Sequence, residues 1–232
     1  LSGFTASGGT EGRLDILADN GVVMLDNITA IDNRVHFKAV NGGEITGALV
    51  TATDAAITLG GSGSVIDLTS LTDVTGSSIT AEDGGVVLLA VNTVIDDTDL
   101  IAQRTIGGSD NAKLTSLRSS WVGGQSSRIL QASGAGTELD LSALTSFTRP
   151  DGQFAALTIR ARDGGRVDLS NLTTFTPSAL LNQSTFNLTA EDAGSVLDLS
   201  ALSELDQADV TIADNGQIDL SSLTKLTDGT VT

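Results

Sequence analysis

The fold is decided by the stretch from Leu157 to Thr173, which reads LTIRARDGGRVDLSNLT. Apolar and polar side chains alternate on both sides of an Asp-Gly-Gly triplet, and this period of two is typical of half-buried β-strands. Aspartate and glycine accept the positive φ that a sharp corner needs. The stretch therefore predicts two short strands joined by a tight turn and followed by a third segment, with no helical stripe.

The same pattern returns along the chain, with near copies at 188–202 and 210–224. A small residue before the corner marks each copy, and the marked residues are Ala18, Ala39, Gly60, Ala81, Ala102, Ala132, Ala161, Ala190 and Ala213. The first four steps between markers are 21 residues long, and the later steps are 30, 29, 29 and 23. A base period of 21 residues that accepts insertions at one place indicates a solenoid.

Two kinds of solenoid have repeats of this size. A leucine-rich repeat is suggested by Leu-Asp-Leu-Ser-Ala-Leu at 139–144 and 197–202, but the glycine-rich corner and the lack of room for a helix argue against it. We therefore expect an all-β fold, a right-handed parallel β-helix of about nine coils of about 21 residues with loop insertions, in which each strand pairs in parallel with its copies above and below. Residues 1–232 are expected to form a single rod.

Residues 103–127 depart from the pattern and are expected to form an irregular coil with loops. Residues 113–118, KLTSLR, read as a degraded copy of the Leu-Ser-Ala-Leu segment. Trp121 is the only tryptophan, and Arg118 lies close to it in the sequence. Because loops of repeat proteins often carry function, Trp121 and Arg118 are candidate glycan contacts. The alternative is that Trp121 covers the core where the coil is irregular.

Composition limits the classes of function. The chain of 232 residues carries a formal net charge of −17, is 40% hydrophobic and only 3% aromatic, and has no cysteine. The acidity argues against nucleic acid as a partner, because phosphate binding needs clustered Lys and Arg. No apolar run is long enough to cross a bilayer, so we expect no membrane insertion. The lack of cysteine removes disulfides and thiolate chemistry.

One column of carboxylates is the best candidate for a binding site. At the same place in their repeats, before Leu and then Ser or Thr, stand Asp67, Asp140, Asp168, Asp198 and Asp219. Stacked on the outward face they would lie about 5 Å apart, where like charges destabilise a sheet. Ca²⁺ would offset this repulsion, so the five are candidate calcium ligands, and no other cofactor is expected. The alternative is that they splay into water, accept hydrogen bonds from the neighbouring Ser and discourage aggregation.

A second column consists of hydroxyls, namely Thr29, Thr72, Thr93, Thr145, Thr173, Ser203 and Thr224. Rows of threonine on a flat β-helix face bind ice in some antifreeze proteins, which makes ice binding a minor alternative function. Such faces use Thr-x-Thr with both side chains outward, whereas here the second hydroxyl usually stands three positions on and would point to the opposite face.

Catalysis is also weighed, because polysaccharide lyases and hydrolases use the β-helix. Lyases need Arg, Lys, Tyr or His beside a metal or a base. The chain has no tyrosine, and its one histidine, His36, is expected to be an exposed surface residue. We assign no catalytic residue. A carbohydrate-active β-helix enzyme, a polysaccharide lyase or tailspike-like depolymerase, is the alternative function.

The repeated Ala-x-Asp-Gly-Gly-x-Val-Asp-Leu-Ser-x-Leu-Thr pattern and the acidity resemble the β-helical repeat regions of large bacterial surface and secreted proteins, the filamentous-haemagglutinin-like adhesins and related exoproteins. The resemblance implies a non-catalytic structural or adhesive rod, extracellular or on the cell surface, whose partners are glycans, cell surfaces or copies of itself. No family site residue is carried over. Residues 229–232 begin another repeat, so we expect either a longer parent chain or end-to-end association into a fibre or surface layer.

Overall fold

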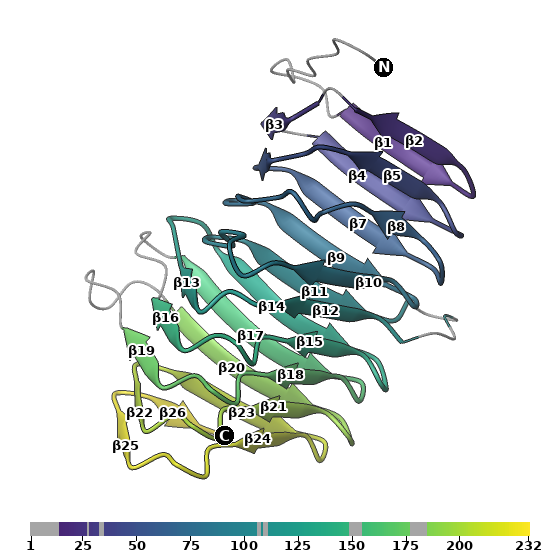
Figure 1. Ribbon diagram of the computed structural model, residues 1–232. Helices are drawn as coiled ribbons and strands as arrows, with labels where there is room; N and C mark the ends of the chain where they lie inside the picture. The colour runs from purple at the N-terminus through teal and green to yellow at the C-terminus, as the bar shows by residue number, and fades with distance from the viewer. Residues whose placement is uncertain are drawn as a thin grey trace.

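The computed structural model describes residues 14–26, 28–32, 35–105, 108, 111–148, 155–176 and 185–232. Within these ranges the chain is all-β, with 26 strands and no helix. The strands stack one above another between the two ends of the molecule (Figure 1). A helix able to span a membrane is accordingly not found in this part of the chain.

One parallel sheet of ten strands runs through all the described repeats, and its spatial order equals its sequence order. Its strands are β1 (Leu14–Asp19), β4 (Val35–Val40), β7 (Ala56–Gly60), β9 (Ser78–Glu82), β11 (Asp99–Gln103), β14 (Arg128–Ser133), β17 (Ala156–Arg162), β20 (Thr185–Glu191), β23 (Asp209–Ala213) and β26 (Thr230–Val231). Each repeat therefore adds one strand to the same edge of the sheet.

The second strands of the repeats form two further parallel sheets. A six-stranded sheet contains β10 (Val86–Leu89), β12 (Lys113–Ser116), β15 (Glu138–Asp140), β18 (Arg166–Asp168), β21 (Val196–Asp198) and β24 (Gln217–Asp219). A three-stranded sheet contains β2 (Val22–Leu25), β5 (Glu44–Gly47) and β8 (Val65–Ile66).

The third segments pair in the same way. They form a three-stranded sheet of β13 (Ser120–Val122), β16 (Ser146–Thr148) and β19 (Thr174–Thr176), and two pairs, β3 (Ala30–Asp32) with β6 (Thr51–Thr53) and β22 (Glu204–Asp206) with β25 (Lys225–Thr227). The ladders between these strands are parallel. Stacked parallel sheets of this kind are consistent with a β-helix-like solenoid.

The register of the large sheet confirms most of the predicted markers and corrects two. Leu59, and not Gly60, pairs with the marker of the preceding repeat. Ile212, and not Ala213, pairs with Ala190, the marker of the preceding repeat. The physical reason is the period of two, since a shift of one residue would turn every inward side chain of the strand outward. A marker residue chosen only for its small size can therefore fall one position away from the inward-facing residue.

The corner after the large-sheet strand is built on positive φ. In the repeat from which the fold was inferred, Asp163 has a φ of 54° and Gly164 a φ of 83°. A Cβ on Gly165 would lie 2.6 Å from the carbonyl carbon of Ala132 in the preceding repeat, so a side chain does not fit there. The amide of Gly164 donates to the Ser195 hydroxyl of the next repeat at 2.9 Å. Consecutive corners are therefore in direct contact.

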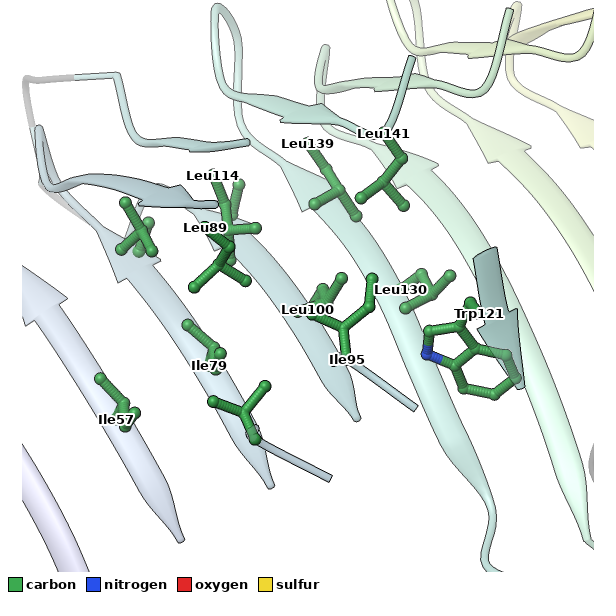
Figure 2. Close-up of a cluster of buried hydrophobic side chains, with 14 of the residues drawn as sticks. Ile57, Ile79, Leu89, Ile95, Leu100, Leu114, Trp121, Leu130, Leu139 and Leu141 are labelled. Atoms are coloured by element: carbon green, nitrogen blue, oxygen red, sulfur yellow. The ribbon is translucent and has the colours of Figure 1, made fainter. Parts of the chain in front are cut away.

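The core consists of inward side chains stacked in register. Ile79 is aligned with Leu100, and Leu100 with Leu130, on three neighbouring strands of the large sheet. Leu114 and Leu139 are aligned in the same way on the six-stranded sheet. All five are fully buried, and Figure 2 shows them filling the space between the strands. Removing one such leucine side chain costs about 2–5 kcal/mol of stability in well-packed cores.

Part of the region 103–127 is more regular than predicted. Residues 113–116 form β12, which pairs in register with β10 and β15, so they are a copy of the second strand and not of the Leu-Ser-Ala-Leu segment. β13 pairs with β16 in the third segment. The loops lie around these two strands, and residues 106, 107, 109 and 110 fall outside the described ranges.

Candidate functional site

Four of the five predicted aspartates form one column on the six-stranded sheet. Asp140 pairs with Asp168, Asp168 with Asp198, and Asp198 with Asp219. Asp67 does not join them, because it follows β8 in a different sheet. The column is interrupted at β10 and β12, where Leu88 and Thr115 occupy the same register position.

Each of the five carboxylates closes a local turn at the end of its strand. The Oδ1 atom accepts a hydrogen bond from the backbone amide two residues further on. The partners are Thr69 for Asp67 (3.0 Å), Ser142 for Asp140 (3.1 Å), Ser170 for Asp168 (3.0 Å), Ser200 for Asp198 (3.2 Å) and Ser221 for Asp219 (2.9 Å). Aspartate favours such turns because its side chain competes with the strand for backbone amides.

Basic side chains of the same chain offset the repulsion within the column. Nη2 of Arg166 lies 2.8 Å from Oδ2 of Asp168 and 2.8 Å from Oδ2 of Asp198. Lys113 lies 2.6 Å from Glu138 and 4.0 Å from Asp140. Lys113, Glu138 and Arg166 pair in register, two residues before the column position in their strands. Charges of opposite sign therefore alternate over these three rows beside the column.

The pKa directions agree with this geometry. Burial would raise the pKa of Asp168, but hydrogen bonds from Arg166 and Ser170 outweigh burial, and the pKa lies below its ordinary value. The hydroxyl and the amide of Thr69 lower the pKa of Asp67. The charged forms of these carboxylates are thus stabilised by donors of this chain.

A calcium ion would compete with these donors. Oδ1 is used by the turn in each of the five aspartates, and Oδ2 of Asp168 and Asp198 is held by Arg166. Among the residues that the structure describes, no three His, Asp or Glu side chains are grouped as a metal site requires. The geometry favours the alternative in which the column is structural, and calcium binding by these residues stays a prediction.

Trp121 is a core residue, which corrects its assignment as a candidate glycan contact. Its side chain is only 1% exposed, and Nε1 donates to the carbonyl oxygen of Thr98 at 3.4 Å. Its ring stacks on Phe147 with a centroid distance of 4.4 Å, and further stacking joins Phe147 to Phe175 and Phe175 to Phe186. The sequence alternative, in which Trp121 covers the core, is the one that the structure supports.

Arg118 is half-buried and does not line a sugar platform with Trp121. Its Nε is buried and has no hydrogen-bond partner in the described part of the chain. Its positive charge acts on Asp96, although burial has the larger effect and raises the pKa of that carboxyl. Glycan contact by Arg118 stays a prediction without the support of the neighbouring indole.

An acidic cluster that the sequence did not reveal fastens the segment after Trp121. Asp96 accepts from the amide of Val122 at 2.9 Å, Asp97 from the amide of Gly124 at 3.0 Å, and Asp99 from the amide of Ile129 at 2.7 Å. Each of these aspartates therefore holds a backbone amide of the following repeat. We call the three residues the aspartate clamp.

Arg128 neutralises part of the aspartate clamp. Its Nη2 lies 2.8 Å from Oδ2 of Asp97, and its Nη1 lies 3.8 Å from Oδ2 of Asp99. Burial raises the pKa of Asp99, and a hydrogen bond from the Ile129 amide and the charge of Arg128 only partly oppose it. The sequence signal was the Asp-Asp-Thr-Asp run at 96–99, with an arginine about one lengthened repeat later.

Five of the seven hydroxyls in the predicted column donate to the backbone. Thr72 donates to the carbonyl oxygen of Val50 at 3.1 Å, and Thr145 donates to that of Ser119 at 3.1 Å. The same bond to the preceding repeat is made by Thr93, Thr173 and Thr224. These hydroxyl protons are used between repeats and do not face outward as a free array.

His36 is also less free than the sequence suggested. It is half-buried on β4, where Nδ1 lies 3.2 Å from Asp15 Oδ1 and Nε2 lies 3.0 Å from Thr58 Oγ1. Both ring nitrogens thus have partners on neighbouring strands. His36 belongs to the polar cross-strand contacts of the large sheet.

Comparison with known proteins gave no match to any family model, curated protein or solved structure. The resemblance to filamentous-haemagglutinin-like adhesins therefore stays a prediction.

Proposed function

We propose that the chain forms a right-handed parallel β-helix that acts as a non-catalytic structural and adhesive rod, extracellular or on the cell surface. The observation that carries the proposal is the use of the conspicuous polar columns within the fold. The aspartate column closes turns and pairs with Arg166, and five hydroxyls of the second column donate to the preceding repeat. Side chains used in this way favour a scaffold over a catalytic centre.

The β-helix itself is supported by the parallel, in-register stacking of three strands per repeat. A right-handed coil is proposed because crossovers between parallel strands of one sheet are right-handed in nearly all proteins. A parallel stack can be extended by any strand that adds to its edge. We therefore propose that the rod grows by end-to-end association of copies or is part of a longer parent chain.

The adhesive role rests on surface chemistry. The net charge of −17 keeps the surface hydrated and disfavours nucleic acid. An extended face of parallel strands offers a long row of outward side chains to a glycan or a cell surface. No separate domain is needed to present them.

Two measurements test the proposal. Small-angle X-ray scattering is expected to show an elongated particle, and a compact sphere would contradict the rod. Incubation with acidic and neutral oligosaccharides is expected to produce no new reducing or unsaturated ends. Clear turnover would refute the non-catalytic role and favour the lyase or depolymerase alternative.

A further inference from the structure

Arg160 is an unusual cation in this acidic chain. It lies on the outward side of β17, where Gln131 of β14 is its neighbour on one side and Thr189 of β20 on the other. Its Nε and Nη2 both donate to Oε1 of Gln131, with Nε at 3.0 Å. Gln131 is buried although it faces outward. The guanidinium is therefore oriented by a neutral amide.

Arg160 has no ion-pair partner among the described residues, whereas Arg128 and Arg166 each contact two carboxylates. Burial lowers the pKa of Arg160, and the neighbouring Arg162 lowers it further. Glu191 and Asp163 act in the opposite direction from a distance. A half-buried charge without a counter-ion lacks the compensation that such groups normally have.

The side chains around Arg160 are also unused. Thr158 stands two residues before Arg160 on the same face of β17, and it pairs with Asn187 of β20. The side chains of Thr158, Asn187 and Thr189 make no hydrogen bond to any residue that the structure describes. By contrast, the outward Gln103 of β11 donates to Glu82 of β9 at 3.0 Å. We call Thr158, Arg160, Asn187 and Thr189 the Arg160 patch.

We propose that the Arg160 patch binds a carboxylate-bearing sugar residue of an acidic saccharide. Neighbouring strands are about 5 Å apart and outward residues about 7 Å apart along a strand, so the patch has the dimensions of one sugar ring. Nη1 of Arg160 carries two N–H donors without a partner among the described residues, and it takes the sugar carboxylate in a charge-assisted hydrogen bond. The two threonine hydroxyls and the asparagine amide, which both donate and accept, take the ring hydroxyls. This inference rests on the proposed adhesive function and assigns its ligand class.

The probe is trigalacturonate, titrated calorimetrically into the whole chain at about 0.15 M ionic strength, where the Debye length of about 8 Å screens the distant negative charge. The wild-type chain is expected to bind trigalacturonate and not neutral maltotriose. Arg160→Gln is expected to weaken binding at least about tenfold, which corresponds to about 1.4 kcal/mol. Thr189→Val, which removes one hydroxyl, is expected to weaken binding several-fold.

The control is Lys225→Gln, which removes an exposed positive charge on β25 and should leave affinity unchanged. Equal affinity of Arg160→Gln and the wild-type chain, with an unchanged melting temperature, would overturn the assignment. If acetate binds as tightly as trigalacturonate, the patch recognises only a carboxylate, and the assignment of a saccharide ligand is wrong. If trigalacturonate does not bind but scattering still shows an elongated particle without turnover, this inference fails while the proposed rod stands.

Discussion

The burial of Trp121 predicts a large and specific effect of its replacement on stability. Trp121→Ala removes a fully buried indole that stacks on Phe147 at 4.4 Å, and such truncations cost about 3–5 kcal/mol. About 0.5–1.5 kcal/mol of this is the stacking itself. The long Nε1 bond to Thr98, at 3.4 Å, contributes no more than about 1 kcal/mol.

Trp121→Phe separates these contributions. It keeps an aromatic ring against Phe147 but loses the hydrogen bond and part of the filled volume, so we expect a loss of about 1–2 kcal/mol. The matched control is Val122→Ala, the next residue on β13, whose side chain faces outward and is 43% exposed. Its effect should lie within about 0.5 kcal/mol of zero, as for most surface positions.

Urea unfolding followed by far-ultraviolet circular dichroism measures all three variants against the wild-type chain. The order of stability loss should be Trp121→Ala, then Trp121→Phe, then Val122→Ala. If Trp121→Ala lowers the free energy of unfolding by less than about 1 kcal/mol, the reasoning is refuted, because truncation of a buried aromatic side chain costs more than this. If the same variant instead lost saccharide binding with full stability, Trp121 would be a surface contact after all.

Three further predictions concern the aspartate column and the aspartate clamp. Arg166→Gln should lower the free energy of unfolding at pH 7 by about 0.5–1.5 kcal/mol, since Arg166 is partly exposed. Because the pKa of Asp168 is lowered, its stabilisation is present above the ordinary carboxyl pKa and is lost as pH falls through the folded-state pKa, so the difference between variant and wild type should shrink in urea titrations at acidic pH. Asp96→Asn should have the opposite profile. Because burial raises the pKa of Asp96, its charged form lowers the free energy of unfolding at pH 7, and this loss is relieved as pH falls through the raised pKa. The variant should therefore be more stable than the wild-type chain at pH 7, and the difference should shrink at acidic pH. Equal stability of the two chains at pH 7 and at acidic pH would contradict this. The melting temperature should be the same in millimolar Ca²⁺ and in chelator, whereas a calcium site with a Kd 100-fold below the calcium concentration would add about 2.7 kcal/mol and raise it.

Much of the fold could be predicted because the same pattern of strand, corner and strand recurs in many repeats. The alternation in β17 and β18 and the Asp-Gly-Gly corner between them define strand, turn and face with local information alone. The register errors at Gly60 and Ala213 arose where a single residue had to be aligned without knowing which neighbours pointed inward. The alternation of inward and outward side chains decides that alignment. This alternation depends on how the strands pair and cannot be read from one residue.

The site was harder to predict because it depends on contacts between repeats. The aspartate column was found from spacing, but its use by Arg166 requires the register of β18 with β21. Trp121 looked like a loop residue because the lengthened repeat hid the strand that carries it. The aspartate clamp was missed for the same reason, since its backbone partners, Val122, Gly124 and Ile129, lie in the lengthened repeat, which the sequence pattern did not align with its neighbours.

The contacts between corners bear on how such a chain can change by duplication. Gly42 donates to the hydroxyl of Ser64 at 3.0 Å, as Gly164 does to Ser195, so a serine in one repeat completes the corner of the repeat before it. Gly165 instead leaves room for the backbone beside Ala132. A repeat that is duplicated into a new position carries only one of the two partners of such a contact, and its new neighbour must supply the other. The heritable module of this protein is thus the junction between two repeats, and a duplication that preserves junctions should be tolerated where one that breaks them is not.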